Sequence, residues 1–260
     1  MTNQLFINNE FIESQSNETM DVINPATGEK FDTITFATKE EVNNAIEKSK
    51  HAQREWERVP QPTRAEHVKL LIPLLEQNRD EIAQLYVKEQ GKTLAEAYGE
   101  IDKSIAFIDY MTSLSMSNKG EVLQNSVENE IIQITKKPIG VTAGIVPWNA
   151  PIMVLMRKVI PAVVTGCSVV IKPSEETTLL TLKLAELFRA STIPAGLIQI
   201  VPGTGETVGT QLATHEDIQL ISLTGSMRAG KSVYEHAAQT VKKVNLELGG
   251  NAPVIVTPRS

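Results

Sequence analysis

Residues 141–175 read VTAGIVPWNAPIMVLMRKVIPAVVTGCSVVIKPSE, and this stretch decides the fold. Residues 141–146 and 168–171 are short, β-branched apolar runs, which favour strands. Between them, apolar residues at roughly helical spacing follow Pro151, which suits the first turn of a helix, and stop at Gly166, a favoured C-cap. A strand, a helix and a strand in so short a span predict a βαβ unit with parallel strands and a right-handed crossover.

Both predicted strands of this unit end in a distinctive motif. Pro147-Trp148-Asn149 follows the first strand, and Lys172-Pro173-Ser174-Glu175 ends the second. In open α/β sheets, ligands bind in the crevice beyond the carboxyl ends of the strands. We therefore expect a binding site where these two motifs meet.

The alternation of strands and helices continues toward the C-terminus and predicts an α/β fold with a doubly wound, Rossmann-like parallel sheet. Further strands are expected at residues 197–201, 218–223 and 241–246, and helices at residues 177–190 and from Ser226 to about residue 239. Gly203, Gly205 and Gly209 form G-x-G-x-x-x-G, which is one residue longer than the dinucleotide-binding fingerprint.

The N-terminal part of the chain is predicted to contain a hairpin, a strand and several helices. The hairpin is expected at residues 5–12, with Asn8-Asn9 in the turn, and the strand at residues 32–37. Helices are expected at residues 38–56, after Pro62, at residues 79–90 and from about residue 93 to 117. Core packing is predicted for Trp56, Leu70, Leu71, Leu74 and Leu75. Residues 125–137 are predicted to form a strand pair that projects from the main sheet.

Composition excludes several classes of protein. A chain of 260 residues with 41% apolar and 22% charged residues predicts a globular fold, and a net charge of −6 without a basic cluster argues against a nucleic-acid partner. The sequence contains no apolar run of membrane-spanning length and no signal-peptide pattern. Its one cysteine, Cys167, excludes an internal disulfide and fits the cytoplasm. Its four histidines lack metal-ligand spacing, so we expect no metal.

Five motifs in order resemble those of the NAD(P)-dependent aldehyde dehydrogenase superfamily. They are Pro147-Trp148-Asn149, Lys172-Pro173-Ser174-Glu175, Pro202-Gly203-Thr204-Gly205, Thr224-Gly225-Ser226 and Glu247-Leu248-Gly249-Gly250. The resemblance covers the whole chain, because Asn24-Pro25-Ala26-Thr27-Gly28 also looks like the opening of that family. The pattern is similar to the lactaldehyde and glycolaldehyde dehydrogenase branch.

The resemblance implies that a cysteine thiolate attacks an aldehyde, that hydride passes to NAD(P), and that water hydrolyses the thioester. Asn149 matches the amide that stabilises the oxyanion, Glu247 matches the general base, and Lys158 matches a supporting position, although a solvated helix lysine is an equal alternative. Glu175 suits the free 2′-hydroxyl of NAD, while NADP is not excluded. Cofactor contacts are implied for Val146, Pro147, Trp148, Lys172, Ser174, Glu175, Gly205, Gly209, Thr224, Gly225, Ser226, Glu247, Leu248 and Gly249. Trp148 is also expected to pack structurally.

The nucleophilic cysteine of the family is absent from this sequence. In the family it lies a few dozen residues beyond the motif at residues 247–250, and Cys167 is expected to be a buried, small apolar residue. The resemblance implies a discontinuous dinucleotide-binding domain at residues 1–124 and 141–250, oligomerisation strands at 125–140, and the start of a truncated catalytic domain at 251–260, with residues 251–256 beginning a strand. A small-molecule aldehyde and a homo-oligomer are the implied partners, and the isolated chain is expected to be inactive.

Two alternatives come from other classes of protein. Residues 225–232 fit G-x-x-x-x-G-K-S, the phosphate-binding loop of NTPases, after a predicted strand and before a helix. Against it, no apolar run ending in a magnesium-binding aspartate follows. The second alternative is a non-catalytic, nucleotide-binding fragment that pairs with a separate catalytic chain.

Overall fold

A seven-stranded sheet with the order β11-β10-β7-β8-β9-β1-β2 forms the centre of the computed structural model, which describes residues 4–257. The strands from β7 to β11 pair in parallel, as predicted. Their bounds are β7 Val141–Ile145, β8 Ser168–Lys172, β9 Ile198–Ile200, β10 Ile218–Gly225 and β11 Lys243–Leu248. Helix α6 (Pro151–Val164) connects β7 to β8, so the predicted βαβ unit is confirmed.

The N-terminal hairpin extends this sheet. Strands β1 (Gln4–Ile7) and β2 (Glu10–Glu13) are joined by Asn8 and Asn9, whose φ angles of 54° and 65° confirm the predicted tight turn. Strand β1 then pairs antiparallel with β9 through Phe6 and Ile200, which makes one edge of the sheet antiparallel. A separate ribbon contains β3 (Thr19–Ile23) and β4 (Lys30–Thr35).

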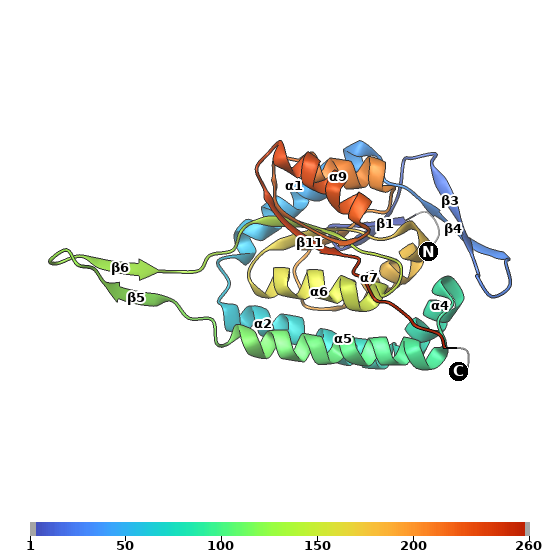
Figure 1. Ribbon diagram of the computed structural model, residues 1–260, viewed down its shortest axis with the longest axis horizontal. Helices are drawn as coiled ribbons and strands as arrows, with labels where there is room; N and C mark the ends of the chain where they lie inside the picture. The colour runs from blue at the N-terminus through green and yellow to red at the C-terminus, as the bar shows by residue number, and fades with distance from the viewer. Residues whose placement is uncertain (1–3, 258–260) are drawn as a thin grey trace.

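Helices cover both faces of the sheet (Figure 1). Helices α1 (Lys39–Trp56), α8 (Thr210–Thr214) and α9 (Met227–Ala238) pack on one face. Helices α6 and α7 (Thr178–Ala190) pack on the other, and an outer layer adds α2 (Gln61–Lys69), α3 (Leu71–Gln77), α4 (Arg79–Gln90) and α5 (Leu94–Ser115). Thr38 and Thr93 cap α1 and α5 with complete capping boxes, which accounts for the predicted helix starts.

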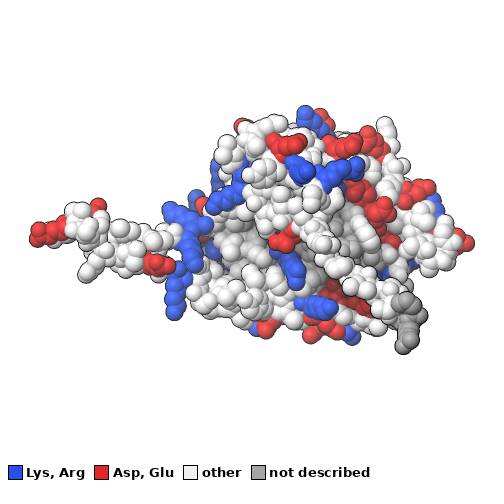
Figure 2. All heavy atoms as spheres, viewed as in Figure 1, with Lys and Arg blue, Asp and Glu red and all other residues white. Residues whose placement is uncertain are grey.

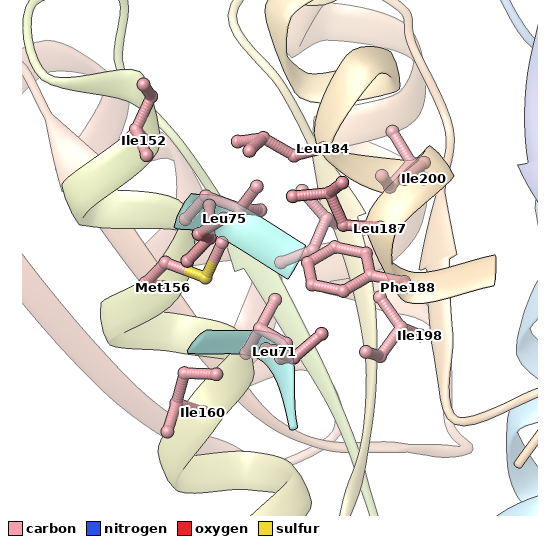
Figure 3. Close-up of a cluster of buried hydrophobic side chains, with 14 of the residues drawn as sticks. Leu71, Leu75, Ile152, Met156, Ile160, Leu184, Leu187, Phe188, Ile198 and Ile200 are labelled. Atoms are coloured by element: carbon pink, nitrogen blue, oxygen red, sulfur yellow. The ribbon is translucent and has the colours of Figure 1, made fainter. Parts of the chain in front are cut away.

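The larger apolar core lies between α6, α7 and the outer helices. Figure 3 shows Leu71 and Leu75 of α3 pointing into a cluster that includes Met156 and Phe188. Trp56 is also buried and donates from Nε1 to the Val163 carbonyl at 2.7 Å, so its predicted core position is confirmed. The prediction for Leu70 is wrong, because its side chain is 48% exposed at the junction of α2 and α3.

A hairpin projects far from the body of the protein, as Figure 1 shows. Its strands are β5 (Glu121–Gln124) and β6 (Ile131–Ile134), so the hairpin begins before residue 125, and residues 125–130 form its turn rather than a strand. Asn129 adopts a φ of 67° in that turn.

The last strand starts later than predicted. Val241 has a φ of 53°, which is incompatible with a strand, so β11 begins at Lys243 and includes Glu247 and Leu248. The predicted strand at residues 251–256 is wrong, because this segment has no regular structure and finds no strand to pair with. Val254, Ile255 and Val256 are between 79% and 87% exposed. The expectations for residues 258–260 lie outside the described residues. No helix in residues 4–257 has the length and apolar character needed to cross a membrane.

Candidate functional site

The site is built at the carboxyl edge of the sheet, where all five parallel strands end. Strand β7 lies between β8 and β10, although the chain visits β8 and β9 before it crosses to β10. The strand order therefore reverses between β7 and β10, and doubly wound folds bind ligands at such a reversal. The topology therefore brings the predicted motifs, which are up to about a hundred residues apart in sequence, to one edge.

Asn149 lies on the surface just before α6, in the loop that follows β7. The backbone of this loop is fixed by Val146, which is buried and whose N–H donates to the Lys172 carbonyl at 3.0 Å. Pro147 is half-buried beside it. The side chain of Asn149 is thus exposed at the carboxyl edge of the sheet.

A carboxylate from another helix caps α6, a feature that sequence reasoning missed. The N-cap residue, Ala150, offers no side-chain acceptor, and Glu100 on α5 instead accepts the Met153 N–H at 3.0 Å. Glu100 is 6% exposed and also accepts the Tyr86 hydroxyl at 2.6 Å and the Lys92 ammonium at 2.9 Å. Burial, followed by this hydrogen bond, raises the pKa of Tyr86 above its ordinary value. No local pattern could reveal the contact, because its partners are 53 residues apart.

Lys172 and Glu175 form a polar pair at the end of β8. The Lys172 ammonium is buried, lies 3.3 Å from the Glu175 carboxylate and donates to the Pro173 carbonyl at 2.8 Å. Burial lowers the pKa of Lys172, and Glu175 opposes that shift. Ser174 caps the short helical turn Glu175–Thr177, so its hydroxyl is turned toward the backbone. Glu175 itself is partly exposed and available to a ligand.

The glycine motif after β9 forms a π-helical turn at Gly205–Gly209, not a dinucleotide-type loop. Thr204 caps the turn by accepting the Thr207 N–H at 3.1 Å. Gly205 is exposed with open space beside it, whereas Gly209 is buried against the aliphatic part of Lys172. The structure thus places Gly205 at the surface and gives Gly209 a packing role.

Thr224, Gly225 and Ser226 lead directly from β10 into α9. Ser226 caps the helix by accepting the Ala229 N–H at 3.2 Å, so the free N–H groups of the first turn point out of the carboxyl edge. Such an N-terminus attracts anions. The NTPase alternative is wrong, because Gly230, Lys231 and Ser232 lie inside α9 and leave no loop to surround a phosphate. Gly230 is needed instead for packing, since a Cβ there would lie 2.7 Å from Leu248.

Glu247 is exposed on the edge strand β11, opposite Thr224 of β10. Leu248 is opposite Gly225, and Gly249 follows the strand in open space. Glu247 and Asn149 therefore both lie at the carboxyl edge of the sheet, at the ends of two strands that β10 separates.

Lys158 is half-buried and turned toward the sheet, so it is not a solvated helix lysine. Its ammonium leaves α6 toward the sheet and donates to the Ser222 hydroxyl at 2.9 Å. Asn245 of β11 donates to the same hydroxyl at 3.4 Å. Burial lowers the pKa of Lys158 to about 8, and Glu247 opposes the shift. Ser222 and Asn245 were not predicted, since only the register of β10 and β11 brings them together.

Trp148 does not pack structurally as expected, because its side chain is 56% exposed. It lines a cavity of about 420 Å³ together with Ile23, Pro25, Glu89, Gln90, Glu176 and Thr177. Glu89 is buried there and accepts the Leu179 and Leu180 N–H groups at 2.7 and 2.8 Å. Burial raises the pKa of Glu89 to about 8, although these N–H donors oppose the shift.

Within residues 4–257, no three His, Cys, Asp or Glu side chains lie close enough together to hold a metal ion. Cys167 is buried and directly precedes β8, at the amino edge of the sheet. The length of β8, about 16 Å, therefore separates its thiol from the carboxyl edge.

Comparison with known proteins gives one consistent result. Residues 11–260 match the sequence profile of the aldehyde dehydrogenase family. The chain is 37% identical over 253 residues to glutarate-semialdehyde dehydrogenase of Pseudomonas putida, and the match covers 97% of this chain and 53% of the relative. It is 36% identical over 252 residues to lactaldehyde dehydrogenase of Escherichia coli, with the same two coverages.

Solved structures agree with this result. The crystal structure of Escherichia coli lactaldehyde dehydrogenase superposes with a TM-score of 0.94 at 36% identity, covering 97% of this chain and 53% of that one. Betaine aldehyde dehydrogenase of Staphylococcus aureus, solved in complex with NAD+, superposes with a TM-score of 0.92 at 34% identity, covering 95% and 51%. The chain thus spans about half the length of the relatives it matches.

Proposed function

The chain belongs to the aldehyde dehydrogenase family, and on that premise we propose that it is the NAD-binding half of an enzyme that oxidises a small aldehyde to a carboxylic acid. The observation that supports the proposal is that Asn149, Glu175, Ser226 and Glu247 all lie at the carboxyl edge of the sheet, near the reversal of strand order.

The residues at this edge of the sheet suit a dinucleotide. The N-terminus of α9 at Ser226 would hold the pyrophosphate, because its free N–H groups and dipole favour an anion. Lys172 and Glu175 would hold the adenosine ribose. Strands β10 and β8 lie two spacings apart, about 10 Å, a separation that suits one extended ligand. When bound, the nicotinamide would supply the hydride acceptor.

Asn149 and Glu247 would act on the aldehyde and on the hydrolytic water, respectively. The amide of Asn149 would donate a hydrogen bond to the oxygen that becomes negatively charged when the aldehyde carbon is attacked, and such a donor is typically worth about 10²–10³ in rate. The carboxylate of Glu247 would take a proton from the hydrolytic water. Its exposed position on the edge strand leaves it accessible to that water.

We propose that the isolated chain does not oxidise aldehydes, because it contains no cysteine other than Cys167. That thiol is buried at the opposite edge of the sheet, so it cannot attack a substrate held near Asn149. The single reduced cysteine also supports a proposed cytoplasmic location.

Calorimetric titration of the purified chain with NAD and with NADP tests the proposal. We expect NAD to bind, and Glu175→Gln to weaken NAD about 10- to 100-fold, because a hydrogen bond to the charged group is lost. The neighbouring variant Glu176→Gln is the matched control, since Glu176 carries the same charge but is exposed one residue further on. Absence of binding to either dinucleotide, or equal effects of the two variants, would contradict the proposal.

We also propose that the projecting hairpin joins copies of this chain into a homo-oligomer. Leu123, Ile132 and Ile134 lie on one face of the hairpin, because Leu123 is opposite Ile132 and Ile134 is two residues further along β6. All three are more than 40% exposed. Figure 2 shows few charged side chains along the middle of the hairpin, so its surface suits burial against a second copy.

Sedimentation velocity tests the proposed assembly. We expect the unaltered chain to sediment as an oligomer and Ile132→Lys to sediment as a smaller species, because a charge in the apolar interface is costly. Gln133→Lys is the matched control, since residue 133 points to the opposite face of the hairpin. A monomeric unaltered chain at all concentrations would refute this role.

A further inference from the structure

The Lys158 side chain is held flat against the sheet. Its ammonium reaches Ser222 on β10, and its aliphatic part lies over Gly144 on β7. A Cβ at position 144 would come within 3.0 Å of Lys158 Cδ and 3.3 Å of Lys158 Cβ. The absence of a side chain at Gly144 therefore leaves the space that the Lys158 side chain occupies. Gly144 on β7 and Ser222 on β10 together fix the position of the amine.

The amine faces a row of small and polar residues. Gly144, Ser222 and Asn245 are adjacent in the register of β7, β10 and β11. Glu247 follows two residues later on the same face of β11, and this face of the edge strand is exposed at Asn245 and Glu247. Lys158 itself is only half-buried, so part of its side chain stays in contact with solvent.

The surroundings keep part of the amine unprotonated. Burial lowers the pKa of Lys158 to about 8, and the negative charge of Glu247 opposes this shift. Its other neighbours on the sheet, Gly144 and Ser222, carry no charge. Among the described residues, no carboxylate lies within 4.0 Å of its ammonium in an ion pair. A hydroxyl both donates and accepts, so Ser222 can satisfy either protonation state. About a tenth of such amines are neutral at pH 7, roughly 300 times the fraction for an ordinary lysine.

We propose that Lys158 is a reversible covalent capture site for small, uncharged aldehydes. The nitrogen lone pair attacks the carbonyl carbon and forms a C–N bond, while the carbonyl π electrons move to the oxygen, which takes one of the two amine protons. The second amine proton leaves with the hydroxyl group as water in the next step. The resulting carbinolamine loses water and leaves an imine between Lys158 and the aldehyde. This chemistry needs no bound dinucleotide and no thiol, so it stands apart from the proposed oxidation.

Lys242 provides an internal comparison. Burial lowers its pKa to about 8 as well. Its ammonium, however, donates to the backbone carbonyls of His215 and Leu212 at 2.5 and 3.4 Å, before the start of β11. Carbonyl oxygens only accept, so they favour the ammonium over the neutral amine. Aldehydes should therefore select Lys158 over Lys242.

The test is reductive trapping of the unaltered chain with propanal and cyanoborohydride, followed by peptide mapping by mass spectrometry. At about pH 7 we expect propyl labelling of Lys158 to exceed that of ordinary exposed lysines by about tenfold or more, and to exceed that of Lys242 as well. Between about pH 7 and pH 9, labelling of Lys158 should rise about 10-fold and that of ordinary lysines about 100-fold. Lys158→Arg should remove the major adduct, and Lys242→Arg should leave it. Labelling of Lys158 equal to that of exposed lysines, or equal to that of Lys242, overturns the proposal. Dinucleotide titration of the same sample separates this outcome from failure of the proposed cofactor role.

Discussion

Replacement of Glu100 by alanine is expected to lower the free energy of unfolding by about 3–5 kcal/mol. The carboxylate is 6% exposed and accepts hydrogen bonds from Tyr86, Lys92 and the Met153 N–H. Without it, a hydroxyl and a backbone N–H lose their buried acceptor, and an ammonium whose side chain is only 25% exposed loses its counter-charge. Urea unfolding followed by circular dichroism measures the loss.

Asp102→Ala is the matched control for this change. Asp102 is two residues further along α5 and also pairs with a cation, Arg79, at 2.7 Å. Its side chain is 57% exposed, so the loss should stay below about 1 kcal/mol. Glu100→Gln should fall between the two, because it keeps an acceptor for Met153 but no charge. Similar losses for Asp102→Ala and Glu100→Ala would show that Glu100 does not stabilise the start of α6.

Leu75→Ala is expected to cost about 2–5 kcal/mol in free energy of unfolding, because it leaves a cavity in the larger core. Leu75 is fully buried among the side chains drawn in Figure 3. Leu70→Ala should cost about 0.5 kcal/mol or less, since that side chain is 48% exposed. The same denaturation experiment measures both variants. A loss for Leu70→Ala as large as that for Leu75→Ala would contradict the packing described above.

The pair Leu70 and Leu75 shows where sequence reasoning stops. Both belong to one leucine-rich run at helical spacing, and the pattern predicted core positions for both. The helix is interrupted at Leu70, which ends α2 and precedes α3, so the apolar stripe does not continue unbroken across the junction. The spacing of apolar residues predicts which face is buried only within one uninterrupted helix, because a break changes the direction of the residues that follow it.

Some residues of the candidate site could be predicted from the sequence, and others could not. The motifs that contain Asn149, Glu175, Ser226 and Glu247 are local, and each lies at the end of a strand whose apolar run is visible in the sequence. Their convergence could be anticipated because parallel strands share a carboxyl edge. Ser222, Asn245 and Glu100 could not be found in this way, since each acts through a partner on another strand or helix.

The sequence by itself determined the βαβ unit, the parallel order of the last five strands, the hairpin turn at Asn8-Asn9 and the family. The structural features follow from hydrophobic period, turn residues and caps, which act over a few residues, whereas the family follows from the resemblance of five short motifs. The three-dimensional structure was needed to show that Glu100 caps α6, that residues 227–232 lie in a helix with no phosphate loop, and that Lys158 lies over Gly144 and is influenced by Glu247. Burial and strand register set these contacts, and neither property belongs to any short segment of the chain.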